Sequence, residues 1–142
     1  MVIPREAGRI TYSTEIRDLK KRLSLNDYQR SVVVGSLLGD ANLTANWSKT
    51  NFSLQIAHSI KQKDYVLWKY EVLRDWFLSP PRYYARNQSL TIKTVSHPEI
   101  TQLSKLFYHN GKKVLPDNIK DIIQDPICLA IWFMDDGNII RR

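Results

Sequence analysis

The chain has 142 residues, which fits one domain that buries roughly 70% of its unfolded surface. Hydrophobic residues make up 43% and charged residues 25%, no apolar run reaches the roughly 18 residues of a membrane span, and the single cysteine, Cys128, excludes an internal disulfide framework. The net charge of +7 favours a polyanionic partner, and nothing in the composition suggests a membrane partner.

The N-terminal part of the chain predicts an arm followed by a helix. Residues 1–25 are polar and mixed in charge, with a short helix expected around 14–23, and we interpret them as an N-terminal arm. Asn26 is a favourable N-cap for a helix over 27–39 that carries an acidic residue in its first turn.

Two strand pairs are predicted, one on each side of a further helix. Apolar and polar residues alternate in 41–59, with a turn at 49–50, and in 82–95, with a turn near 87–88. This pattern is typical of β-hairpins. Asp and Glu are absent from both segments, whereas Lys and Arg are present, so the two hairpins predict a surface suited to phosphate.

Helices are also predicted over 64–78, 98–108 and 126–136. The first must end at the Pro80-Pro81 pair, because proline disfavours helical geometry before it and lacks its own donor. Prolines also fit the first turns of the other two helices. The order of helices and tight hairpins predicts an α+β fold with an antiparallel sheet.

One helix design occurs twice. Residues 32–41 (VVVGSLLGDA) and 129–138 (LAIWFMDDGN) are apolar on all sides and end in an aspartate, Asp40 or Asp136, before a small residue. The two aspartates lie 96 positions apart (136 − 40), which is the size of one αββαββ unit. A helix that is apolar on every side must be surrounded by protein, so we expect the two to pack together, with glycines allowing close approach.

This packing predicts a metal site at the shared end of the two helices. Asp40 and Asp136 would lie at the negative poles of the helix dipoles, where two carboxylates repel one another. A divalent cation relieves the repulsion, and the oxygen ligands suit Mg²⁺. Such a metal beside a basic surface favours phosphodiester cleavage. Each aspartate taken alone is more commonly a cap or turn residue, and the repetition favours the catalytic interpretation.

The two segments resemble the paired signature helices of the LAGLIDADG homing endonuclease family, in its double-motif, single-chain form. GSLLGDANL is similar to the first motif and LAIWFMDDGNI to the second, and DWFLSPPR and SHPEITQLSKLFYHNGKKVLP also resemble the family, so the resemblance covers about residues 28–139. It implies an arm at 1–25, one αββαββα repeat with an antiparallel DNA-binding saddle at 26–125, and the first helix of a second repeat at 126–142.

The resemblance also implies roles for individual residues. Asp40 and Asp136 would be catalytic carboxylates that bind Mg²⁺, for which Mn²⁺ can substitute. Lys113 would support the phosphate or the attacking water beside them. Without the resemblance, Lys113 would be interpreted as part of a solvated turn. Asp135 fits either a catalytic helper or a solvent-facing helix end.

Side chains on the saddle would bind double-stranded DNA in the major groove. The outward positions fall among Asn42, Thr44, Asn46, Lys49, Gln55, Arg82, Tyr84, Arg86, Thr91 and Lys93. All four tryptophans are expected in the core rather than against bases: Trp47, Trp68, Trp76 and Trp132. Residues that lack zinc-site spacing are expected to be structural or surface groups: His58, His97, His109 and Cys128.

These features predict an intron-encoded, site-specific homing endonuclease that hydrolyses double-stranded DNA. Five residues follow Gly137, so we expect the isolated chain to be weakly active or inactive and to need a missing second half or a partner chain. Apolar surface is then expected around Ile127, Ile131 and Trp132. The alternative is an intron RNA maturase, with intron RNA as partner, or a non-cleaving DNA-binding protein on the same fold. A basic structural protein would leave the repeated aspartates unexplained.

Overall fold

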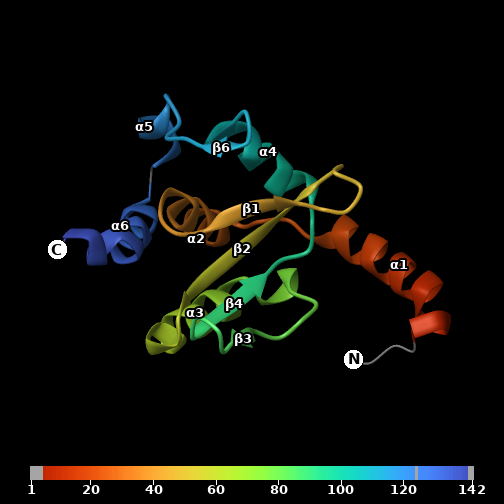
Figure 1. Ribbon diagram of the computed structural model, residues 1–142. Helices are drawn as coiled ribbons and strands as arrows, with labels where there is room; N and C mark the ends of the chain where they lie inside the picture. Colours follow the sequence, from red (N-terminus) through yellow and green to blue (C-terminus); the bar gives the residue numbers. More distant parts are fainter. Residues whose placement is uncertain (1–4, 124, 141–142) are drawn as a thin grey trace.

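The computed structural model describes residues 5–123 and 125–140 (Figure 1). The helices are α1 (Arg5–Arg22), α2 (Asp27–Leu38), α3 (Lys63–Val72), α4 (Pro98–Phe107), α5 (Ile119–Ile122) and α6 (Pro126–Ile140), with 3-10 turns at Ile60–Gln62 and Arg74–Trp76. The strands are β1 (Asn42–Ala45), β2 (Phe52–Ser59), β3 (Arg82–Tyr84), β4 (Ser89–Lys93), β5 (Tyr108–His109) and β6 (Lys112–Lys113). The two-residue strands β5 and β6, the short helix α5 and the 3-10 turn at Ile60–Gln62 were not predicted from the sequence.

Strands β1 to β4 form one antiparallel sheet in the order β1-β2-β4-β3. Gln55 of β2 lies opposite Asn42 of β1 and Lys93 of β4, and Arg82 of β3 lies opposite Thr91 of β4. Side chains alternate between the two faces of a strand, so these five polar residues share one face of the sheet. The predicted α+β fold with an antiparallel sheet is confirmed.

The hydrophobic core lies on the other face of the sheet, beneath helices α2, α3 and α4. Leu54 and Ile56 of β2 are buried in one cluster with Leu37 of α2, Val66 of α3 and Leu103 of α4. Apolar side chains thus alternate inward along the strands, and this leaves the polar face free of helices α2 to α4.

Helix α2 begins and α6 packs as the sequence predicts. Asn26 caps α2, because its side chain accepts a hydrogen bond from the Gln29 backbone at 2.7 Å. Along the seam with α6, a Cβ atom on Gly35 would lie 2.7 Å from the Cys128 carbonyl oxygen, and one on Gly39 would overlap the Asp135 side chain. Glycine is needed at both positions because the two backbones approach so closely.

Helix α6 differs from the prediction in its length and in its exposed side. It continues through Asp136 and Gly137 to Ile140 instead of ending at the aspartate. One glycine inside a helix costs only about 1 kcal/mol, so Gly137 does not stop it. The expectation of exposure at Ile131 is wrong, since this side chain is buried against α2, and Ile127 and Trp132 are half-buried. The exposed apolar side chains are instead Leu129, Phe133 and Met134.

Two further expectations are wrong. Helix α1 begins at Arg5 rather than near residue 14, because no proline interrupts the segment, and its last turn is tied to the rest of the domain by a 2.8 Å hydrogen bond from Lys20 to Ser96. Trp47 is 99% exposed at the turn between β1 and β2, and Trp68 is 38% exposed on the outer side of α3, whereas Trp76 is buried.

Among the described residues, no helix is long and apolar enough to span a bilayer.

Candidate active site

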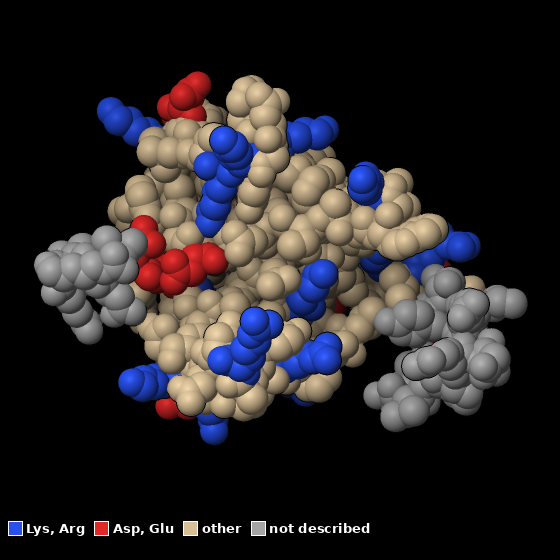
Figure 2. All heavy atoms as spheres, in the orientation of Figure 1, with Lys and Arg blue, Asp and Glu red and all other residues tan. Residues whose placement is uncertain are grey.

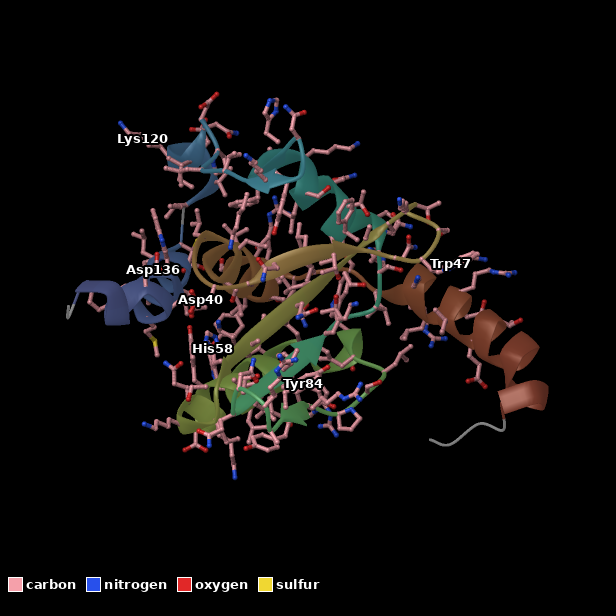
Figure 3. All side chains as sticks on the ribbon, in the orientation of Figure 1. Asp40, Trp47, His58, Tyr84, Lys120 and Asp136 are labelled. Atoms are coloured by element: carbon pink, nitrogen blue, oxygen red, sulfur yellow. The ribbon has the colours of Figure 1, made fainter. Side chains whose placement is uncertain are left out.

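Asp40 lies immediately after the C-terminus of α2. The helix ends at Gly39, whose N–H donates to the carbonyl oxygens of Gly35 and Ser36. Ala41 is buried and its N–H returns to the Ser36 carbonyl at 2.9 Å, so the chain turns sharply and leaves the Asp40 side chain half exposed. Figure 3 shows Asp40 and Asp136 near each other, where the C-terminal end of α2 packs against α6.

Asp40 lies among two further carboxylates and two lysines. Partial burial raises the pKa of the Asp40 carboxyl, and the carboxylates of Asp135 and Asp136 raise it further, while Lys69 and Lys113 oppose the shift. The structure therefore brings Asp40 and Asp136 within electrostatic reach of each other, as the packing of the two helices predicts. Such a pair favours a bound cation.

Lys113 reaches this site from β6, far along the chain. Its Nζ donates hydrogen bonds to the Gly39 carbonyl at 2.8 Å and to the Ala41 carbonyl at 2.5 Å, on both sides of Asp40. Burial lowers the pKa of the Lys113 amine, and the nearby carboxylates, led by Asp40, oppose this shift. Lys113 thus stands beside the proposed catalytic residue and also binds carbonyls left free at the end of α2.

The donor set fits Mg²⁺ but offers few protein ligands. Asp136 is half-buried on α6, and the Trp132 indole donates to its Oδ2 at 2.9 Å. Within the described ranges, no group of three or more His, Cys, Asp or Glu side chains is placed to hold a metal ion. Mg²⁺ typically binds through one or two carboxylates and completes its shell with water and substrate phosphate, so Asp40 and Asp136 are the residues that would hold it.

A buried polar cluster behind Asp40 was missed by the sequence analysis. Asp135 is buried rather than solvent-facing, and its carboxylate accepts hydrogen bonds from Lys69 at 3.1 Å and from the Tyr65 hydroxyl at 2.6 Å. His58 of β2 lies 3.8 Å from Asp40 through Nδ1. A signal existed in the sequence: Lys69 occupies a helical position among apolar residues of α3, and His58 continues the inward alternation of Leu54 and Ile56.

The polar face of the sheet, which we call the open face, carries most of the predicted DNA-binding residues. A groove of about 460 Å³ on it is lined by Gln55, Arg82, Tyr84, Thr91 and Lys93, among others. The Arg82 guanidinium lies 5.4 Å from the centroid of the Tyr84 ring. Figure 2 shows Lys and Arg side chains over β3 and β4, and acidic side chains gathered where α2 and α6 meet.

The predicted DNA-binding residues that do not line this groove divide into two groups. Asn42, Lys49 and Arg86 are exposed. Asn46 is half-buried, and its side-chain oxygen accepts hydrogen bonds from backbone N–H groups of the hairpin turn, including Thr50 at 2.9 Å, so it shapes the turn. The Thr44 hydroxyl is also buried. The structure therefore makes Asn46 and Thr44 weaker candidates for base contact.

Comparison with known proteins gives matches over most of the chain. A sequence model of the LAGLIDADG DNA endonuclease family matches residues 30–142. The chain is 33% identical over 120 residues to the protein RecA of Mycolicibacterium chitae, a match covering 83% of this chain and 28% of the relative. It is 31% identical over 131 residues to the probable intron-encoded endonuclease 1 of Wickerhamomyces canadensis, covering 86% of this chain and 55% of the relative.

A solved structure has the same fold. The homing endonuclease I-WcaI, bound to its DNA recognition sequence, superposes with a TM-score of 0.73 at 26% sequence identity, over 85% of this chain and 56% of that one. The chain therefore spans between 28% and 56% of the length of these three proteins.

Proposed function

The chain belongs to the LAGLIDADG DNA endonuclease family, and from this premise we propose that it binds double-stranded DNA and supplies catalytic carboxylates of a site-specific, intron-encoded endonuclease. The observation that carries the proposal is the position of Asp40 and Asp136. They lie 96 positions apart in sequence (136 − 40), and both are near the point where the C-terminal end of α2 packs against α6. The open face of the sheet carries basic side chains and no described acidic one.

Each part of the site has a role in phosphodiester hydrolysis. Asp40 and Asp136 would hold Mg²⁺, which when bound supplies a Lewis acid and lowers the pKa of water. The Lys113 ammonium, fixed beside Asp40, stabilises negative charge that develops on the phosphate. Arg82 and Lys93 bind phosphates or guanine edges, and Gln55 suits the edge of adenine. The hydrogen bond from the Trp132 indole limits how far the Asp136 carboxylate can move.

The proposal is tested by incubating the chain with intron-insertion-site DNA and Mg²⁺. The reaction is run with and without a second polypeptide, which corresponds to the part of a relative that this chain does not match. We expect Mg²⁺-dependent double-strand cleavage under at least one of the two conditions. Mn²⁺ should replace Mg²⁺. A chain that binds DNA but never cleaves under either condition would support the maturase or DNA-binding alternative instead.

The variant Asp40→Asn tests whether Asp40 is required for cleavage. It removes one of the two metal-binding charges and preserves side-chain size, so we expect cleavage to be abolished while DNA affinity is kept. Asp121→Asn, an exposed change on α5, is the matched control and should cleave like the wild type. Cleavage by Asp40→Asn would reject the metal role of this aspartate.

A further inference from the structure

A buried ion pair lies directly behind the two proposed metal-binding aspartates. The side chains of Lys69, on α3, and Asp135, on α6, are both 0% exposed. Lys69 Nζ lies 3.1 Å and 3.3 Å from the two Asp135 oxygens, and 4.3 Å from the centroid of the Tyr65 ring. The Tyr65 hydroxyl donates to Asp135 at 2.6 Å. The Asp135 carboxylate is therefore fully buried, and two residues of α3 hold it in place.

The pair reaches Asp40 by two routes. Asp135 Oδ2 accepts a hydrogen bond from the backbone N–H of Asp40 at 3.2 Å. Lys69 Nζ lies 3.3 Å from Nε2 of His58, and Nδ1 of the same ring lies 3.8 Å from the Asp40 carboxylate. The ammonium can only donate, so it leaves the imidazole proton on Nδ1, facing Asp40. The pair thus holds the backbone of Asp40 through a hydrogen bond and lies behind its side chain through the His58 ring.

The seam between α2 and α6 depends on the same carboxylate. The side chain of Asp135 occupies the space that a Cβ atom on Gly39 would fill. Asp136 follows Asp135 on α6, so whatever fixes Asp135 against the end of α2 also fixes Asp136 relative to Asp40. Apolar side chains of similar size would fill this volume but could not accept the donors from Lys69, Tyr65 and Asp40.

We propose that Lys69 and Asp135 are positioning residues, which set the separation of Asp40 and Asp136 and thereby the affinity of the site for a divalent cation. The inference rests on the proposed function, since it takes Asp40 and Asp136 as metal ligands. Groups that orient metal ligands typically change metal affinity about 10- to 100-fold when they are removed. The pair should therefore affect metal binding more than it affects DNA binding.

The test is a titration of the full chain with Mn²⁺, followed by electron paramagnetic resonance, for the wild type, Lys69→Met, Asp135→Asn and the double variant. Lys69→Met is the decisive single change. It removes a positive charge near the site, which by charge alone would strengthen Mn²⁺ binding, whereas loss of positioning weakens it. We expect weaker binding in Lys69→Met, by about 10-fold or more.

The double variant separates positioning from stability and from charge. It leaves no unpaired buried charge and preserves the net charge, so we expect its thermal unfolding midpoint to recover towards that of the wild type. Its Mn²⁺ affinity should stay low, and the Asp40 amide should exchange faster with solvent, because an uncharged amide oxygen is a weaker acceptor than the carboxylate of Asp135. The double variant also keeps the test valid if either single variant fails to fold.

Matched exposed variants, Lys105→Met and Asp121→Asn, should bind Mn²⁺ like the wild type. Wild-type Mn²⁺ affinity in the double variant, or tighter binding by Lys69→Met, would overturn the inference while leaving the proposed function intact. Absence of Mn²⁺ binding by the wild type would instead reject the proposed metal site, and this inference with it.

Discussion

We propose two tasks for the ammonium group of Lys113, one structural and one catalytic, and a variant can separate them. Its Nζ binds the Gly39 and Ala41 carbonyls and lies among the carboxylates of the site. Lys113→Ala should slow cleavage by about 100-fold, as expected for removal of one group that stabilises developing charge. It should weaken DNA binding by less than about 10-fold, because at most one phosphate contact is lost. Single-turnover rates and equilibrium binding at fixed salt measure the two effects.

Lys112 provides the control for this prediction. It precedes Lys113 on β6, is exposed, and has the same charge. Lys112→Ala should leave the cleavage rate near that of the wild type. If Lys113→Ala weakened binding more than it slowed cleavage, Lys113 would be a phosphate anchor and not part of the chemistry.

His58 makes the stability of the domain depend on pH. Burial, with help from Lys69, lowers the pKa of His58 from 6.5 to about 4, although Asp135 opposes the shift. The folded protein keeps the ring neutral, while the unfolded chain binds a proton below pH 6.5. Stability contributed by the neutral ring is therefore fully present above pH 6.5 and is lost as pH falls towards 4. The loss from this group is at most about 3 kcal/mol.

The variant His58→Gln isolates this effect, because Gln does not titrate and other groups cancel in the comparison. In urea unfolding in metal-free buffer, the wild type should lose about 3 kcal/mol more than His58→Gln between pH 7 and pH 4. His109→Gln, at an exposed position on β5, should retain the wild-type pH dependence. Equal pH dependence in the wild type and His58→Gln would show that the ring is protonated in the folded state.

At the scale of elements, the contact between α2 and α6 decides whether the site forms. Gly39→Ala places a methyl group against Asp135 and should destabilise the domain by about 1–3 kcal/mol, as expected for overpacking of a close contact. Because the methyl group separates the ends of the two helices, cleavage should fall as well. Urea unfolding at pH 7 measures the free energy of unfolding.

Ser36→Ala is the matched change on the same helix. Ser36 is fully buried, and its hydroxyl has no hydrogen-bond partner within the described part of the chain. Removing that hydroxyl should change the free energy of unfolding by less than about 1 kcal/mol. A Gly39→Ala variant as stable as Ser36→Ala would mean that the helix ends can separate without cost.

At the scale of the whole molecule, the charge of the open face sets the response of DNA binding to salt. The logarithm of affinity should fall linearly with the logarithm of salt concentration, with a slope of about −0.9 per phosphate neutralised. Arg82→Ala and Lys93→Ala should each reduce the slope by about 1 if their side chains bind phosphate. Fluorescence anisotropy with a labelled duplex over a salt series gives these slopes.

Lys120→Ala is the control, since Figure 3 places this lysine on α5, away from β3 and β4. Its slope should equal that of the wild type. A salt response that is flat in the wild type would remove nucleic acid as the partner, and equal losses in all three variants would mean that net charge acts without a defined binding face.

Much of the fold could be predicted because its signals are local. The cap at Asn26, the alternation in the strands and the turn near Gln88, where φ is 51°, each depend on a few neighbouring residues. The two apolar segments that end in Asp40 and Asp136 indicated that the helices pack against each other, because a helix that is apolar on all sides must be surrounded by protein. The family and its fold followed from the same motifs.

Other features depended on which side chains the folded chain brings together. Trp47 is aromatic, yet it lies exposed in a turn, away from the hydrophobic core. Gly137 does not end α6, which continues to Ile140. The burial of Asp135 could not be read from MDDG, since its partners come from α3 and β2, about 66 and 77 residues earlier (135 − 69 and 135 − 58).

The sequence by itself determined the elements, the pairing of the two aspartate-bearing helices and the basic character of the strands, because periodicity and charge are properties of short segments. The tertiary structure decided that Lys113 stands beside Asp40, and that Lys69 and Asp135 are enclosed behind it. The physical reason is that a charge is tolerated in a core only where specific partners surround it, and those partners are fixed by the three-dimensional fold.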